Sequence, residues 1–333
     1  MTPEGVLDAA VGIRVLVVGD ICLDRWCWYD PELSEPSRET GIPRRAVVAS
    51  KCTPGAGGTV ASNLCALGVG QVTVLGTVGT GGAGHDLQAA LACRGIDAGQ
   101  LIADRRVVTF TYTKLINAAS GQEDEPRVDF VNTTALPESL QRRLIDRFSA
   151  LVESYDAVIV ADQAETPEGG SITSEVRDEI CRAAGSHRAT KFLGDSRSRV
   201  ELFRNCTMTP NEEEAAAGSQ RAFGDVDYGR LQGLIGGPVL VVTAGSRGAW
   251  LVEGGVSHLL PPAPAKQVVD VCGAGDSLTA GMALALAAGA GPDAALQFGM
   301  LVASVTVGKR GTGTADSSEV LAAAETADWG GQA

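Results

Sequence analysis

The chain contains few residues of the kinds that hold zinc or form disulfides. Its three histidines, His85, His187 and His258, lie far apart, and no Cys/His cluster has the spacing of a zinc site. Its eight cysteines include no Cys-x-x-Cys pair and show no paired spacing typical of a disulfide framework. We therefore expect reduced thiols, and we expect any metal ion to be held by oxygen atoms.

Basic residues and long apolar runs are also scarce. The 333 residues include 27 Lys and Arg against 40 Asp and Glu, which gives a formal net charge of −13 at pH 7. This charge disfavours a nucleic-acid backbone or an anionic membrane surface as a partner. The small-apolar stretch at residues 280–290 is too short to span a bilayer, and residues 1–12 lack the apolar segment of a signal peptide. We expect a cytoplasmic protein that binds neither nucleic acid nor membrane.

The hydrophobic pattern predicts an α/β fold. Short apolar, β-branched runs alternate with helical patterns, which is typical of βαβ units around a parallel sheet. The predicted buried strands are residues 14–19, 71–78, 157–161, 191–194 and 239–243. Residues 137–154 place apolar side chains on one helical face, and Thr173 is suited to cap another helix.

Two stretches interrupt this alternation. Residues 24–51 are rich in Pro, Ser, Glu and Arg, and residues 106–130 alternate Val108, Phe110 and Tyr112 before a polar turn near Gly121. We expect both stretches to form a small accessory sheet that acts as a lid. No interdomain linker is evident, so we expect one domain over residues 1–333.

Residues 269–277 are the most informative segment, because they join an apolar run to a helical pattern. Glycines at a helix start expose amide N–H groups at its positive end, so Gly273, Ala274 and Gly275 could cradle a phosphoryl group in transfer. A carboxylate is repelled by bound phosphate, so Asp276 would serve there to accept a proton from an attacking hydroxyl. The alternative is an ordinary glycine-rich loop with Asp276 as a helix cap.

Two further segments are suited to a nucleotide. Asn211 and Glu214 begin a helical segment and carry oxygen atoms that could organise Mg²⁺ indirectly, although such residues often only compensate the helix dipole. Thr243, Gly245 and Gly248 follow a predicted strand and could wrap nucleotide phosphates. The alternative for this second segment is a simple turn between two strands.

A third glycine-rich segment indicates another class of enzyme. Residues 79–84 match Gly-x-Gly-x-x-Gly, and Asp97 or Asp104 lies roughly where a ribose-binding acid would be expected. A NAD-dependent oxidoreductase is therefore an alternative, although a chain with 42 glycines matches this pattern easily. The P-loop pattern Gly-x-x-x-x-Gly-Lys-Ser/Thr does not occur, which excludes P-loop kinases.

Together and in this order, the motifs resemble those of the ribokinase-like (PfkB) carbohydrate kinases from Arg14 to about Thr314. The specific element is Asp270-x-x-Gly-Ala-Gly-Asp276. Residues 18–25 and 307–312 are similar to segments of D-glycero-β-D-manno-heptose 7-phosphate kinases within that family. The resemblance implies a three-layer α/β/α fold with a mostly parallel central sheet and a small β-sheet lid.

The resemblance also implies roles for site residues. Asp276 would be the catalytic base and Gly273, Ala274 and Gly275 the anion hole. Asn211 and Glu214 would organise Mg·ATP, with Glu214 acting on Mg²⁺ through water, and Thr243, Gly245 and Gly248 would bind the nucleotide. A monovalent cation such as K⁺ would lie near Asp270. The acceptor would meet Asp24, Gly55, Gly57, Gly58, Thr59 and Asn63, where Thr59 stands at a position that is Asn in the family pattern.

We therefore expect a kinase that uses ATP and Mg²⁺ to phosphorylate a hydroxyl of a sugar or sugar phosphate, with heptose 7-phosphate as one candidate. The resemblance also implies a homodimer formed through the lid. A nucleoside kinase of the same fold is an alternative, because Trp26, Trp28 and Tyr112 in the expected lid could stack on a base.

Overall fold

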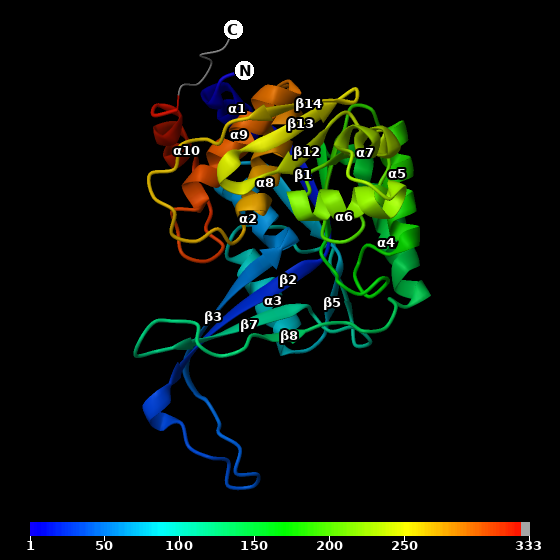
Figure 1. The fold of residues 1–333 in the computed structure, drawn as a ribbon. Coiled ribbons are helices and arrows are strands. Elements are labelled where there is room, and N and C mark those ends of the chain that lie inside the picture. Colours follow the sequence, from blue (N-terminus) through cyan, green and yellow to red (C-terminus); the bar gives the residue numbers. More distant parts are fainter. Residues whose placement is uncertain (328–333) are drawn as a thin grey trace.

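The computed structural model describes residues 1–327, so residues 328–333 of the expected domain lie outside the described residues. Its centre is an eight-stranded sheet with the order β14-β13-β12-β11-β10-β9-β1-β4 (Figure 1). These strands are β1 (Arg14–Gly19), β4 (Gln71–Leu75), β9 (Ala157–Asp162), β10 (Lys191–Ser196), β11 (Thr207–Met208), β12 (Leu240–Thr243), β13 (Ala249–Glu253) and β14 (Val256–Leu260). Six neighbouring strands of this sheet, β4, β1, β9, β10, β11 and β12, run parallel to one another, and β13 and β14 add an antiparallel edge.

Helices cover both faces of this sheet (Figure 1). One face carries α1 (Pro3–Ala10), α2 (Gly57–Ala66), α8 (Ala274–Ala287), α9 (Pro292–Thr306) and α10 (Ser317–Ala324). The other carries α4 (Glu138–Leu151), α5 (Ser174–Ser186), α6 (Glu212–Phe223) and α7 (Tyr228–Ile235). This three-layer α/β/α arrangement confirms the expected fold class. Within residues 1–327, no helix has the length and apolar character needed to cross a membrane.

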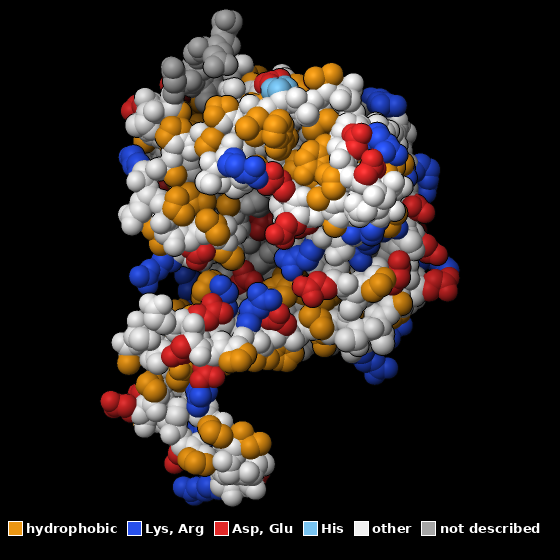
Figure 2. Space-filling view, in the orientation of Figure 1, with side chains coloured by type: hydrophobic (Ala, Val, Ile, Leu, Met, Phe, Trp, Pro, Cys, Tyr) orange, Lys and Arg blue, Asp and Glu red, His pale blue; other side chains and the backbone are white. Residues whose placement is uncertain are grey.

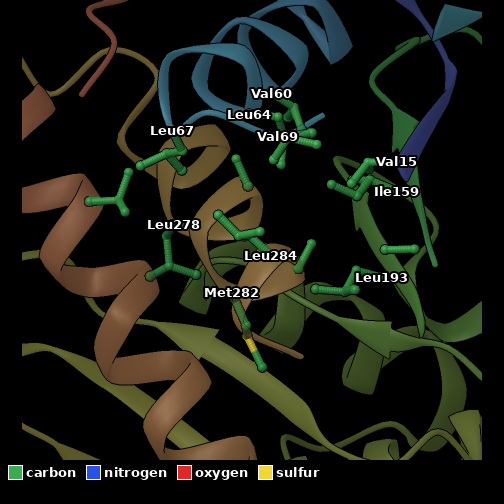
Figure 3. Packing of buried hydrophobic residues seen from close by; sticks show 14 of the residues in the cluster. Val15, Val60, Leu64, Leu67, Val69, Ile159, Leu193, Leu278, Met282 and Leu284 are labelled. Atoms are coloured by element: carbon green, nitrogen blue, oxygen red, sulfur yellow. The ribbon is translucent and has the colours of Figure 1, made fainter. Parts of the chain in front are cut away.

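Alternating residues of β1 enter two separate hydrophobic clusters. Val15 and Val17 pack on the side of α2 and α8, whereas Leu16 and Val18 pack on the side of α4 and α5. All four are buried, which explains why the strand is apolar throughout instead of alternating with polar residues. Figure 3 shows the first cluster, where Val15 lies among apolar side chains of α2 and α8.

Helices α8 and α9 pack backbone to backbone. A Cβ added to Gly281 would lie 3.0 Å from Cα of Gly299, and a Cβ added to Gly299 would lie 2.6 Å from the carbonyl oxygen of Leu278. Glycine is required on both helices because any side chain would push them apart. The position of α8 is therefore set by close contact with α9.

A second sheet of four strands adjoins the C-terminal end of β1 (Figure 1). It consists of β2 (Ile21–Asp30), β3 (Ala46–Ala56), β7 (Thr111–Asn117) and β8 (Val128–Phe130), in the order β3-β2-β7-β8. Only Asp20 separates β1 from β2, so the small sheet is a direct continuation of the central one. Residues 31–45, which include the 3-10 turn η1 (Pro31–Leu33), extend away from the body in Figure 1. The role of this sheet as a lid stays a prediction.

The single strand predicted for residues 71–78 is wrong. The chain forms β4, turns at Gly76, and continues as β5 (Thr77–Gly79), which pairs with β6 (Ile102–Asp104) in a separate sheet. A Cβ at position 76 would lie 2.2 Å from the carbonyl oxygen of Gly19. The backbone therefore passes close to the end of β1 at a position where only glycine fits, and the chain beyond it pairs outside the central sheet.

Candidate active site

Polar loops meet at the carboxyl ends of the parallel strands, the edge at which ligands bind in open α/β sheets. Two cavities lie there. The first, of about 200 Å³, lies between this edge and the small sheet, and the second, of about 290 Å³, lies beside α8 and α9. Figure 2 shows the hollow between the body and the small sheet, with acidic and basic side chains around it.

The first cavity brings together segments from across the whole sequence. From the predicted site residues it contains Asp24, Thr59, Gly273 and Asp276. Its full lining is Asp24, Trp26, Ala56, Thr59, Tyr112, Lys114, Arg127, Gln163, Arg197, Cys272, Gly273, Asp276 and Thr312. Carboxylates and donors of this kind suit a ligand with several hydroxyl groups.

The predicted acceptor glycines lie behind the wall of this cavity. A Cβ on Gly55 would lie 2.6 Å from Oδ1 of Asp24, so glycine there leaves room for the carboxylate. Gly57 and Gly58 pack against β2 and the end of β3 at the buried start of α2. The buried Asn63 side chain donates to the Thr59 carbonyl at 3.1 Å. Of the residues predicted in this segment, only Thr59 borders the cavity itself.

The start of α8 separates the two cavities. Gly273 borders the first, whereas Ala274 and Gly275 border the second. Gly273 is the helix N-cap with φ +79, and α8 has no side-chain cap. The Ala274 amide donates to the Val271 carbonyl at 3.2 Å. The next amides in the first turn of such a helix lack an acceptor within the helix and can bind an anion. The arrangement can hold a phosphoryl group between two bound molecules.

Several carboxyl groups lie close together around Asp276. Burial raises the pKa of Asp24 to about 6. Burial, followed by the negative charge of Glu214, raises the pKa of Asp195 to about 7. The pKa of Asp276 is raised well above its ordinary value by burial and by the charges of Asp195 and Asp24. Clustered carboxylates of this kind repel one another and favour a bound proton or cation.

We expect Asp195→Asn to raise the melting temperature of the ligand-free protein at pH 8. The pKa of Asp195 is raised from 3.8 to about 7 by folding, so between these pH values the folded protein keeps a proton on Asp195 that the unfolded chain has already released. The contribution of Asp195 to the free energy of unfolding therefore favours the folded state at low pH and is lost as the pH rises through 7. Asparagine keeps an oxygen that can accept from Gln163 and removes the charge.

Thermal unfolding between pH 5 and 8 measures this effect. Asp156→Asn is the control, because the Asp156 carboxylate accepts from the Arg14 amide at the opposite end of β1. If Asp195→Asn melts at a lower temperature than the wild type at pH 8, the charge of Asp195 does not destabilise the folded protein.

The second cavity is mostly apolar and contains the loop predicted to bind the nucleotide. Thr243, Gly245 and Gly248 line one side. The opposite side consists of Val268, Val271, Ala274, Gly275, Leu278, Met300, Ala303, Ser304 and Val307, while Ser246, Pro262, Ala263 and Ala265 complete the lining. Gly248 has φ +101, and a Cβ there would lie 2.0 Å from the Leu260 carbonyl oxygen. The loop thus depends on glycine, and the cavity has the character of a site for a flat apolar group.

Asn211 and Glu214 form a capping box at the start of α6. The Asn211 side chain accepts from the Glu214 amide at 2.9 Å, and the Glu214 carboxylate accepts from the Asn211 amide at 2.9 Å. These two residues therefore serve as a helix cap in the local structure, and their role in binding Mg·ATP stays a prediction. Burial raises the pKa of Glu214, which lies near Arg197 and Asp195. Its position also leaves it available to a cation.

Asp270 ties two loops of the site together. Its carboxylate accepts from the amide of Cys272 at 2.9 Å and from the amide of Gly311 at 3.0 Å. Gly311 in turn packs against Trp26 of the small sheet, where an added Cβ would lie 3.0 Å from the indole ring. The predicted monovalent-cation site near Asp270 stays a prediction.

The first cavity contains three basic residues besides the predicted catalytic, acceptor and nucleotide residues. Lys114 and Arg127 come from the hairpin of the small sheet, and Arg197 follows β10. Lys114 lies 4.7 Å from the ring centre of Trp26, and Arg127 lies 5.1 Å from that of Tyr112. The period-two alternation that was seen up to Tyr112 places Lys114 on the same strand face, so this residue could have been predicted.

The Gly79–Gly84 segment does not form the dinucleotide-binding turn that its spacing suggested. It follows β5, which pairs with β6 instead of the central sheet, and leads into α3 (Gly82–Ala92) beside the small sheet. A Cβ on Gly84 would lie 1.9 Å from the Gly79 carbonyl oxygen. Asp104 is bound by Arg106 at 2.8 Å. These glycines serve a tight turn away from the central strand ends.

Comparisons with known proteins agree with this geometry. The model of the pfkB family carbohydrate kinases matches residues 14–319. The chain is 30% identical over 318 residues to the Bifunctional protein HldE of Desulfatibacillum aliphaticivorans, covering 93% of this chain and 62% of that protein. It therefore spans less than two thirds of the length of that relative.

Two solved structures show the same fold. Arabidopsis thaliana ribokinase complexed with ribose and ATP has a TM-score of 0.69 at 20% identity, covering 94% of this chain and 99% of that one. Escherichia coli phosphofructokinase-2 in complex with fructose-6-phosphate has a TM-score of 0.70 at 20% identity, with 95% and 99% covered.

Proposed function

The chain belongs to the pfkB family of carbohydrate kinases, phosphotransferases with an alcohol group as acceptor, and we propose that it transfers the γ-phosphoryl group of Mg·ATP to a hydroxyl of a sugar or sugar phosphate. One observation carries this proposal. The segment from Gly273 to Asp276 borders a polar cavity on one side and an apolar cavity on the other. An acceptor and a nucleotide bound in these cavities would meet at the uncapped start of α8.

On the acceptor side, Asp24 and Thr59 would bind hydroxyl groups of the sugar. Asp276 would accept the proton of the attacking hydroxyl, since its carboxylate lies at the end of the cavity nearest to α8. Its raised pKa suits a base that must take up a proton during the reaction. The small sheet above the cavity would exclude water and so limit hydrolysis of ATP.

On the nucleotide side, the apolar cavity would receive the base, and Gly245 and Gly248 would allow close approach to the backbone. The amides at the start of α8 would stabilise the negative charge of the phosphoryl group in transfer, where preorganised donors contribute most. This arrangement favours positioning and charge stabilisation over covalent chemistry.

Within residues 1–327, no three His, Cys, Asp or Glu side chains form a complete metal site, so a magnesium ion would depend on water and substrate phosphates as well. Asn211, Glu214 and Asp195 would offer it oxygen donors, and the mutual repulsion of the carboxylates is the kind that a bound cation relieves. When bound, Mg²⁺ supplies positive charge that neutralises the phosphates. Glu214 would hold this ion through water, as the resemblance implies.

Basic side chains in the first cavity support an acceptor that carries a phosphate, such as heptose 7-phosphate. Arg127 and Arg197 could pair with phosphate oxygens, although each already contacts an acid, Asp129 at 2.7 Å and Glu165 at 3.2 Å. The nucleoside alternative has less support, because Lys114 covers the ring of Trp26. A homodimer formed through the small sheet stays a prediction.

The direct test is ADP formation from Mg·ATP with hexoses, pentoses, heptose 7-phosphate, other sugar phosphates and nucleosides as acceptors. Acceptor-dependent ADP formation supports the kinase, and the best acceptor identifies its class. ATP binding without turnover on any acceptor would contradict the proposed reaction for these compounds. NADH binding without ATP binding would contradict the nucleotide site.

We expect Glu214→Gln to raise the Mg²⁺ concentration needed for half-maximal activity by about tenfold, as loss of a residue that orients a metal site commonly does. Glutamine retains an oxygen for the α6 cap and loses the charge. Glu319→Gln is the matched control, because Glu319 forms the same capping box with Asp316 at α10. A Mg²⁺ titration of ADP formation measures both variants, and equal Mg²⁺ requirements in them would argue against this role of Glu214.

A further inference from the structure

Asp20 has a buried carboxylate at the junction of the central and small sheets. The residue is 1% exposed and joins β1 to β2. Its carboxylate accepts three backbone N–H groups, from Gln163 at 3.0 Å, from Ala164 at 2.9 Å and from Ser171 at 2.7 Å. All three donors belong to the loop that follows β9, so one side chain holds both ends of residues 163–171.

The backbone of Asp20 connects the same point to two other parts of the site. Its amide donates to the carbonyl of Ala161 at 2.9 Å, and its carbonyl accepts from the amide of Gly57 at 3.2 Å. Gly57 begins α2, which carries Thr59 into the acceptor cavity. Asp20 therefore links the end of β1, the start of α2 at Gly57 and the loop 163–171.

Gln163 extends this connection to the catalytic side of the cavity. It lines the acceptor cavity, and its side-chain amide donates to Oδ2 of Asp195 at 2.8 Å. The charge of Asp195 is close enough to Asp276 to raise the pKa of Asp276. A shift of the loop would therefore move a cavity side chain and break its hydrogen bond to a neighbour of the expected base.

The cost of burying Asp20 indicates that its contacts are specific. Removing a carboxylate from water is unfavourable. The Arg199 guanidinium lies near enough for the charge of Asp20 to raise its pKa, so a cation offsets part of this cost. Within residues 1–327, Asp20 forms no salt bridge, and its hydrogen bonds come from backbone amides. Such charge-assisted bonds are short and directional, and they define one loop conformation. Gly170 allows this approach, because a Cβ there would lie 2.8 Å from Oδ1 of Asp20.

We propose that Asp20 is a positioning residue for the acceptor, and that it acts by holding loop 163–171 so that Gln163 faces the acceptor hydroxyls. This role rests on the proposed kinase function. It assigns acceptor recognition to Gln163, beside Asp24 and Thr59.

Asp20→Asn, Gln163→Ala and the double variant test this role. Because small misplacements of a binding group have large kinetic effects, we expect each single change to raise the KM for the acceptor about tenfold or more. The KM for ATP should stay nearly unchanged. The double variant should be no worse than the more affected single variant, because both changes remove the same contact. Asp156→Asn is the matched control, since it alters a carboxylate–amide bond at the other end of β1.

Hydrogen exchange of the amides of Gln163, Ala164 and Ser171 gives a readout that does not depend on catalysis. Faster exchange at these amides in Asp20→Asn, with the core of β1 still protected, supports the positioning role even if no acceptor is turned over. Unchanged exchange overturns it, as does an equal rise in the KM values for both substrates. If Asp20→Asn does not fold, Gln163→Ala decides: an unchanged KM for the acceptor overturns the proposal.

Discussion

Replacing Asp276 with asparagine is expected to lower turnover by about 10²- to 10⁴-fold, the usual contribution of a general base. This loss corresponds to about 3–5 kcal/mol of transition-state stabilisation. Asparagine has the same shape but cannot take the proton of the attacking hydroxyl. ATP binding should be retained, because the apolar cavity and the loop at Gly245 and Gly248 are untouched.

Single-turnover kinetics and direct ATP binding separate these two effects. Asp293→Asn is the matched control, since Asp293 occupies the first turn of the neighbouring helix α9 and lies outside both cavities. Turnover of Asp276→Asn close to that of the wild type would remove Asp276 from the mechanism. A parallel loss of ATP binding would mean that the residue acts in nucleotide binding instead.

The second large effect is expected at Gly273. In Gly273→Ala, an L-residue must adopt φ +79, which costs about 1–2 kcal/mol. The added Cβ would also lie 3.3 Å from Cγ2 of Thr59 and 3.4 Å from Cγ2 of Thr312. Relieving these contacts takes a shift of a few tenths of an ångström, by the two threonine side chains or by the start of α8. Because misplacement by about 1 Å can cost about 10²-fold, we expect this smaller shift together with the backbone strain to lower turnover by up to about 10²-fold.

Gly289→Ala separates backbone strain from the effect on the site. Gly289 follows the other end of α8 with φ +93, and a Cβ there meets nothing within 4 Å. Both variants should lose similar amounts of thermal stability, whereas only Gly273→Ala should lose turnover. If both variants keep full activity, the start of α8 does not form the anion hole.

Local patterns were sufficient to predict β1, β9, β10 and β12 and the glycine-rich start of α8. A buried parallel strand is nearly continuous in apolar residues, so β1 was predicted with the bounds it has in the structure. Thr173 was predicted as a cap, and its hydroxyl accepts from the Val176 amide at 3.4 Å. These features depend on neighbours within a few residues, which is why the sequence alone reveals them.

Features that depend on distant segments could not be predicted in the same way. The strand alternation indicates the face on which Lys114 lies, but that this face borders the cavity depends on the pairing of β7 with β2, which places Tyr112 opposite Asp24. The break at Gly76 coincides with a close contact to Gly19, a neighbour in space and not in sequence. The roles of Asn211 and Glu214 illustrate a third limit. Their cap is a local feature, whereas their proximity to Asp195 depends on the order of strands in the sheet.

The close contact between Gly281 and Gly299 has a consequence for how this protein can evolve. A helix that contacts its neighbour through backbone atoms cannot move without losing this packing. The residues at the start of α8 therefore keep their position as long as the contact with α9 is kept. The small sheet contacts the acceptor cavity through side chains such as Trp26 and Lys114, which can change without disturbing the central core. For the proposed kinase, we therefore expect changes of acceptor to arise from substitutions in the small sheet, while the helix that carries Asp276 stays as it is.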